Sequence, residues 1–263
     1  MMRHSARWLS CALLALLLIG CATTPDAPSH GREGMDRVSP VRAAEVNTRL
    51  GVGYLERGQL QLAIEKLDTA LRHDPQHTPA HLTLALIYEQ LGDSRRAGQH
   101  YRQASRLAPN DGATQNAFAV HLCRQQQFRE AERHFERAMN DPFYNTPELA
   151  YANAGACARR AGDAAQAEQH LRRALEIDPE FGDALYQLAE LYFEKDEPFR
   201  ARAFLQRYEG VSGLNAAALK LGYQIENGLN NRAQAHQYAN RLEQDFPDSL
   251  QARELRSQRQ EDE

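Results

Sequence analysis

The chain has 263 residues and a formal net charge of −4, a length that suits one large solenoid or two ordinary domains. A slightly acidic balance argues against nucleic acid as a partner, because nucleic-acid binding depends on a basic surface. Leu, Ala, Gln, Glu and Arg are abundant, whereas Val, Ile and Thr are scarce, which favours helices over strands. We therefore predict an all-α protein.

Residues 1–20 have the pattern of a secretory signal peptide. Two arginines precede an apolar run from Leu9 to Ile19, and this run is too short to span a membrane. The segment Leu18-Ile19-Gly20-Cys21 resembles a bacterial lipobox, in which the cysteine becomes the acylated mature N-terminus. We expect lipidation of Cys21, which would anchor the chain stably. The alternative is an ordinary signal peptide with an unrelated cysteine.

The residues after this cysteine predict where the anchored chain resides. Ala22 stands where enterobacterial lipoproteins of the inner membrane carry Asp, so the sequence resembles an outer-membrane address. Residues 21–43 contain prolines among Thr, Ser, Gly and Asp, with no apolar period, which is typical of a flexible tether. Such a tether reaches roughly 25 Å. We expect a periplasmic body held at the outer membrane.

Residues 44–263 repeat one pattern with a period of about 34 residues. Each copy has a large residue, a small residue and a tyrosine or other apolar residue, then two alanines around a bulky residue and often a closing proline. In the second copy these positions are Leu84, Ala85, Tyr88, Ala97, Tyr101, Ala104 and Pro109. The offsets resemble the tetratricopeptide (TPR) consensus, with units at about 44–77, 78–111, 112–147, 148–181, 182–214 and 215–247.

The TPR resemblance implies a superhelical solenoid of about six helix-turn-helix repeats with a C-terminal capping helix. Small residues such as Gly51 and Gly155 would let the paired helices approach closely, and bulky residues at the seventh position, Leu50 in the first repeat, would fill the gap. Because no repeat buries its apolar face alone, the repeats must stack. The segment 248–258 is predicted to be the cap, with Asp248 and Gln251 spaced as a capping box.

Two cysteines remain in the repeats, Cys123 in the third and Cys157 in the fourth. Both fall on the first helix of a repeat, and neighbouring first helices pack side by side. Because the periplasm is oxidising, we expect a disulfide across this junction. The alternative is a pair of buried free thiols packed as small apolar residues.

The sequence lacks the motifs that would predict catalysis. No phosphate-binding glycine loop, His-Glu-x-x-His or Gly-x-Ser-x-Gly segment occurs. His73, His77 and His81 follow an i, i+4 spacing but cross an Asp-Pro break, so they do not share one helix face. We predict no metal, no other cofactor and no small-molecule substrate, and therefore a binding protein in place of an enzyme.

In a TPR superhelix the first helix of each repeat lines the inner surface. The first two repeats would present there Thr48, Val52, Leu55, Leu82, Leu86 and Glu89. Because open apolar surface marks binding sites, these residues predict a groove for a partner protein. The alternative is that they contact the neighbouring repeat and belong to the core. The later repeats are more charged at these positions and suit polar segments.

A lipobox, a short tether and about six TPR repeats with a cysteine in the third and fourth resemble the PilF/PilW family of type IV pilus biogenesis lipoproteins. The resemblance implies a monomeric pilotin that binds a secretin subunit. Its acyl chains would carry the pair to the outer membrane, where the secretin assembles into the ring needed for pili and twitching motility. Two other classes remain open, a scaffold for another cell-envelope assembly machine and an enzyme.

Overall fold

A computed structural model describes residues 39–261, with side chains up to residue 258. The signal peptide, Cys21 and the tether up to residue 38 lie outside the described residues. Within the described range the chain forms thirteen α-helices and no strand, so the predicted all-α class is confirmed. None of these helices is both long and apolar enough to cross a membrane.

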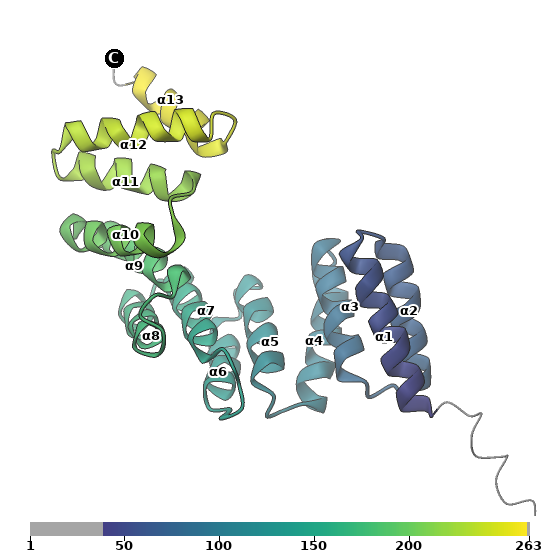
Figure 1. Ribbon diagram of the computed structural model, residues 1–263. Helices are drawn as coiled ribbons and strands as arrows, with labels where there is room; N and C mark the ends of the chain where they lie inside the picture. The colour runs from purple at the N-terminus through teal and green to yellow at the C-terminus, as the bar shows by residue number, and fades with distance from the viewer. Residues whose placement is uncertain (1–38, 262–263) are drawn as a thin grey trace, which may run out of the picture.

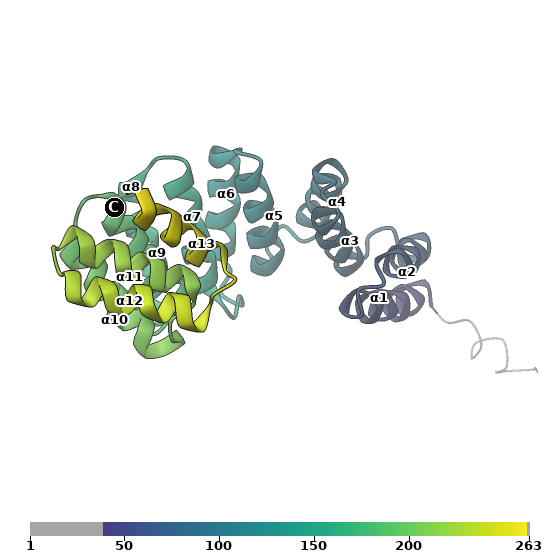
Figure 2. The ribbon, with the colours of Figure 1, turned by 90° about the horizontal axis from the view of Figure 1, so that it is seen from above.

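Twelve helices form six antiparallel hairpins, and a last helix follows them. The hairpins are α1 (Pro40–Glu56) with α2 (Leu60–His73), α3 (Thr78–Gln90) with α4 (Ser94–Leu107), α5 (Gly112–Arg124) with α6 (Phe128–Met139), α7 (Pro147–Arg160) with α8 (Ala164–Ile177), α9 (Gly182–Glu194) with α10 (Pro198–Ser212), and α11 (Ala216–Gly228) with α12 (Arg232–Asp245), followed by α13 (Leu250–Glu261). The hairpin axes turn progressively along the stack, from upright at α1 to nearly level at α12 (Figure 1). Seen from above, α1 to α4 project to one side of the later helices (Figure 2).

The first helix begins about one turn earlier than the sequence predicts. Residues 40–43 were expected to be tether, but α1 starts at Pro40, and the Ser39 hydroxyl accepts a hydrogen bond from the Arg42 amide at 3.2 Å. A proline suits the first helical position because its missing N–H has no helical partner there and its φ is already helical. The prediction was wrong because this proline was assigned to the tether when it starts the helix.

The core repeats with the hairpins. The second helices bury an alanine and a bulky residue in each of the first five hairpins: Ala63 and Leu67, Ala97 and Tyr101, Ala131 and Phe135, Ala167 and Leu171, Ala201 and Leu205. Glycine sets the closest approach within two hairpins. A Cβ added to Gly51 would lie 2.7 Å from Cγ of Leu67, and one added to Gly155 would lie 2.6 Å from Cγ of Leu171. The close helix contact expected at these glycines is therefore present.

Leu50 departs from the expected core. The residues at the same position of the next repeats, such as Leu84 and Phe118, are buried, whereas Leu50 is 47% exposed. Phe118, for example, stacks on Tyr101 of the preceding hairpin, with ring centroids 6.4 Å apart. No hairpin precedes α1 within the described residues, so Leu50 is left at the open end of the stack. The prediction that Leu50 fills an inter-helix gap was wrong for this reason.

The other end of the stack is covered by α13. Ala252 and Leu255 of this helix are fully buried against Leu219 and Leu242 of the last hairpin. The helix begins at Leu250, and the Ala252 amide donates to the Ser249 hydroxyl at 3.1 Å. The predicted capping helix is present, but Ser249 caps it, so the capping box expected at Asp248 was wrong. Serine accepts this bond as readily as Asp.

Candidate protein-binding surface

The first helices of the first two hairpins, α1 and α3, carry the predicted groove residues. Leu86 is the most open of them, with 51% of its surface exposed. Val52, Leu55 and Leu82 are half-buried, and the last two also pack against the core. These four side chains therefore make an apolar surface on which Leu86 is the residue most available to a partner.

Thr48 belongs to the core and does not line a groove. It is only 6% exposed on α1, and its hydroxyl has no hydrogen-bond partner among the described residues. An isolated buried hydroxyl is energetically unfavourable. The structure therefore supports at Thr48 the alternative that the sequence left open, a core position.

Glu89 joins three helices and is not free for a partner. Its carboxylate lies 2.8 Å from Nδ1 of His121 and accepts hydrogen bonds from Arg124 at 2.8 Å and from the Tyr101 hydroxyl at 3.1 Å. Burial alone would raise the pKa of Glu89, but the His121 hydrogen bond, the Arg124 charge and the Tyr101 hydroxyl outweigh burial and lower it. Glu89 therefore ties α3 to α4 and α5.

The inner surface becomes polar at the fourth and fifth hairpins. Arg159 of α7 forms ion pairs with Glu190 at 2.8 Å and with Glu194 at 3.2 Å, both on α9. Tyr186 lies beside this group, and burial together with the Glu190 carboxylate raises the pKa of its hydroxyl. These pairs hold α7 against α9 and leave a charged surface where the first hairpins are apolar.

The two cysteines are bonded across the third and fourth hairpins. Cys123 of α5 and Cys157 of α7 form a disulfide, with Cα atoms 5.8 Å apart and a sequence separation of 34. Closing a loop of this length restricts the unfolded chain and stabilises the fold by about 2–4 kcal/mol. The bond therefore fastens the middle of the stack, near the C-terminal ends of α5 and α7.

The three histidines singled out in the sequence do not meet at one site. His81 pairs with His100 of the next helix, their Nδ1 atoms lying 3.0 Å apart, and its Nε2 lies 3.1 Å from the Pro75 carbonyl oxygen. Nδ1 of His77 lies 3.8 Å from Asp74. Among the described residues, no three His, Cys, Asp or Glu side chains are placed to hold a metal ion.

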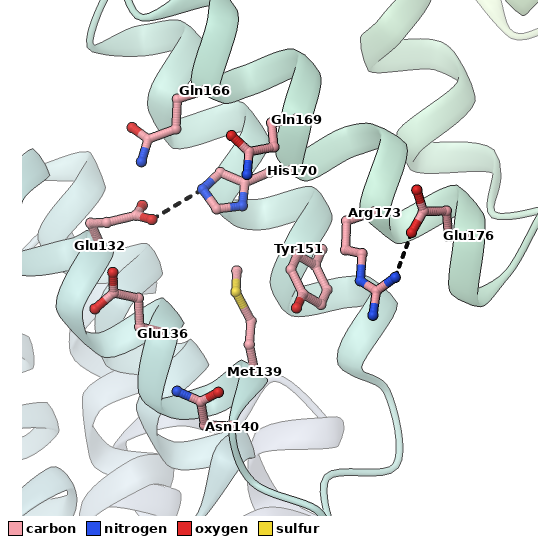
Figure 3. A pocket seen from close by; sticks show the side chains of 10 residues that line it. All are labelled: Glu132, Glu136, Met139, Asn140, Tyr151, Gln166, Gln169, His170, Arg173 and Glu176. Carbon is pink, nitrogen blue, oxygen red and sulfur yellow. Dashed lines mark hydrogen bonds and ion pairs between the residues drawn. The ribbon is translucent and has the colours of Figure 1, made fainter.

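A pocket on the opposite side of the hairpins was not predicted from the sequence. It lies between the second helices α6 and α8, has a volume of about 570 Å³, and is drawn in Figure 3. Glu132 and Glu136 of α6 and His170 and Arg173 of α8 line it. Their i, i+4 and i, i+3 spacing was the available signal, but nothing in the sequence shows that these two faces lie opposite each other.

Comparison with known proteins agrees with this arrangement. Two tetratricopeptide repeat models match, one at residues 54–113 and 158–221 and the other at 116–180. The type IV pilus assembly protein PilF of Pseudomonas aeruginosa is 27% identical over 248 residues, covering 94% of this chain and 96% of PilF. An uncharacterised protein of Haemophilus influenzae is 34% identical over 136 residues, covering 52% of this chain and 76% of that protein.

Two solved structures match closely. The crystal structure of PilW, described as a widely conserved type IV pilus biogenesis factor, aligns with a TM-score of 0.75 at 31% identity, covering 81% of this chain and 97% of PilW. The structure of Pseudomonas aeruginosa PilF aligns with a TM-score of 0.72 at 25% identity, covering 84% of this chain and 100% of PilF.

Stacked hairpins with buried alanines at these offsets, and two matching repeat models, define the chain as a TPR solenoid protein. It belongs to the PilF/PilW family of TPR proteins of type IV pilus biogenesis.

Proposed function

We propose that this chain acts in type IV pilus biogenesis as a pilotin, anchored by lipid to the periplasmic face of the outer membrane. In this role it binds a secretin subunit and promotes secretin localisation and multimerisation. The observation that carries the proposal is the match to PilF over nearly the whole of both chains. The lipobox-like segment ending at Cys21 and the outer-membrane address at Ala22 support the anchor.

The apolar surface of α1 and α3 is the proposed contact for the secretin segment. Leu86 is the exposed residue of this surface, whereas Leu82 and Val52 are half-buried. Because Leu86 is 51% exposed, burying the rest of its side chain contributes about 1–1.5 kcal/mol to an association. An Asp at position 86 would lose this contribution and would also leave a carboxylate in an apolar contact.

A binding measurement tests this contact. The mature chain with Cys21→Ser is titrated calorimetrically with a purified periplasmic fragment of the secretin. We expect saturable binding that Leu86→Asp weakens by roughly tenfold or more. Leu250→Asp is the matched control, because Leu250 is 57% exposed on the distant α13, and its affinity should equal that of the wild-type chain. Equal binding by Leu86→Asp would reject this surface, and absence of wild-type binding would reject the pilotin role.

The anchor is tested separately in cells. Replacement of the acyl acceptor, Cys21→Ser, should abolish labelling by a fatty-acid analogue and release the chain from the outer-membrane fraction. Acylation that persists in this variant would contradict the lipobox assignment. If the wild-type chain is acylated but its deletion affects a different envelope complex and leaves pili intact, the scaffold alternative replaces the pilotin.

A further inference from the structure

The pocket between α6 and α8 has a defined composition. Glu132 and Glu136 project from α6, and His170 and Arg173 project from α8, while Tyr151 of α7 and Met139 lie between the two walls (Figure 3). The lining residues of each helix are three or four positions apart, which places them on one face. The cavity of about 570 Å³ is large enough for a side chain with its flanking backbone.

This pocket is separate from the surface assigned to the secretin. It is built by the second helices of the third and fourth hairpins, whereas the apolar surface lies on the first helices of the first two hairpins. Along the ribbon, α6 and α8 are also remote from α1 (Figure 1). A ligand can therefore occupy the pocket while the apolar surface is engaged.

The charges around the pocket favour a cation. Three carboxylates line it, those of Glu132, Glu136 and Glu176, against one guanidinium, that of Arg173. Arg173 pairs with Glu176 on its own helix, and Oε1 of Glu132 lies 3.0 Å from Nε2 of His170. No described residue forms an ion pair with Glu136. An anionic ligand would meet this excess of negative charge, and a purely apolar one would desolvate it at a cost.

The uncharged residues narrow the class of cation. The Tyr151 ring and the Met139 thioether offer apolar contact for a methylene stem, and an aromatic face attracts a cation. Gln166 and Gln169 on the α8 wall can donate to and accept from a peptide backbone. A small inorganic cation could use the glutamine amide oxygens, but it has no methylene stem to contact Tyr151 and Met139. A planar guanidinium would use them best, because it stacks on aromatic rings and binds carboxylates in a two-pronged geometry.

We propose that this pocket binds an arginine side chain on an exposed segment of a second partner protein, with Glu136 as the principal carboxylate and Tyr151 as the stacking surface. The chain is then a two-sided adaptor. The apolar face of the early hairpins takes one partner, and the acidic pocket of the middle hairpins takes a basic residue of another.

The test uses the mature chain with Cys21→Ser and a capped Gly-Gly-Arg-Gly-Gly peptide as the probe, followed by amide chemical shifts in NMR spectra. We expect saturable shifts in α6 and α8. The same peptide with citrulline in place of arginine, which has nearly the same shape but no charge, should produce none. Glu136→Gln should weaken binding roughly tenfold, and Tyr151→Leu about two- to fivefold.

Glu45→Gln serves as the matched control, because Glu45 is an exposed glutamate on α1, away from the pocket, and this variant should bind as the wild-type chain does. Four results would each overturn the proposal: equal shifts with the citrulline peptide, unchanged affinity of Glu136→Gln, shifts confined to the inner surface, or no saturable shift. None of them bears on secretin binding, which is measured with a different ligand at a different surface.

Discussion

At the scale of single residues, glycine sets how closely the two helices of a hairpin pack. Gly155 of α7 lies where the Leu171 side chain of α8 crosses it, and an added Cβ would come within 2.6 Å of Leu171 Cγ. Real Cβ atoms do not approach that closely, so any larger residue forces the helices apart. The small residue therefore determines the geometry of the hairpin, although glycine is unfavourable inside a helix.

Gly155→Ala should lower the free energy of unfolding by about 1–3 kcal/mol, because overpacking outweighs the better helix propensity of alanine. Gly210→Ala is the control. An added Cβ at this helical glycine of α10 has no atom within 4 Å, so a gain of about 0.5–1 kcal/mol is expected. Urea unfolding measures both. Gly155→Ala matching the wild-type midpoint would contradict the close approach.

A second residue-scale feature is the pair of histidines between α3 and α4. Burial, with smaller effects from the charges of His81 and Arg96, lowers the pKa of His100 to about 4. Burial also lowers the pKa of His81, although its hydrogen bond to Pro75 opposes this. In the unfolded chain such imidazoles bind protons near pH 6.5. Below that pH the unfolded state therefore binds more protons than the folded state does, and stability falls.

The stability of the chain should thus decrease as the pH falls from about 6.5 towards about 4. His100→Gln should reduce the difference between urea midpoints measured at about pH 7.5 and about pH 5. The variant lacks an imidazole that stays neutral in the folded state and binds a proton on unfolding. His236→Gln is the control, since His236 is exposed on α12 and takes no part in the buried pair. An unchanged pH dependence in His100→Gln would show that the buried pair is not responsible.

At the scale of elements, neighbouring hairpins are joined by polar contacts as well as by apolar packing. Between the fifth and sixth hairpins, Arg202 of α10 donates two hydrogen bonds to Glu226 of α11, at 2.7 and 2.5 Å. Asn231 adds a third to the same carboxylate at 2.9 Å. The Glu226 side chain is only 4% exposed, so its charge depends on these donors.

Arg202→Met should therefore cost about 3–5 kcal/mol of unfolding free energy, because it leaves a buried carboxylate without its cation. Arg202→Met combined with Glu226→Met should recover much of this loss. Arg241→Met removes a comparable pair with Glu209 that is largely exposed, and it should cost no more than about 1 kcal/mol. Denaturant unfolding of the four proteins checks the order. Similar losses for Arg202→Met and Arg241→Met would contradict the role of burial.

The elements themselves could be predicted from the sequence, because each repeat carries its helix-pairing signals locally. Ala97, Tyr101 and Ala104 of one repeat predict the buried face of α4 without reference to any other part of the chain. The end of the stack could not be predicted in this way. Leu50 fits the consensus as well as Leu84 does, but it is exposed because no hairpin precedes α1 within residues 39–261.

The candidate sites depend on contacts one repeat away, which local patterns do not encode. Glu89 matched a groove position, yet His121 and Arg124 of the next repeat hold it. Thr48 is similarly buried, so two of the six predicted groove residues are not available to a partner. The pocket between α6 and α8 could not be predicted either, because it depends on how the third and fourth hairpins are rotated relative to each other. That rotation is a property of the assembled superhelix and is not encoded in any single repeat.

At the scale of the whole molecule, the part of the chain that the structure describes forms a stack that is covered at one end and open at the other. α13 buries the apolar face of the last hairpin, whereas Val46, Leu50 and Leu62 remain exposed on the first. In solenoids each repeat contacts mainly its neighbours, and an end repeat without a polar cover leaves apolar surface. The open end is therefore the N-terminal one, formed by the hairpin that follows the predicted tether in the sequence.

The central claim is that this solenoid brings secretin subunits to the outer membrane for assembly. The most direct test is to delete the chain in its own bacterium, separate the membranes, and measure secretin multimers in the outer-membrane fraction, with the wild-type gene restored as the control. We predict that secretin multimers in this fraction fall sharply on deletion and return on complementation. Secretin multimers at the wild-type level in the outer membrane without this chain would contradict it.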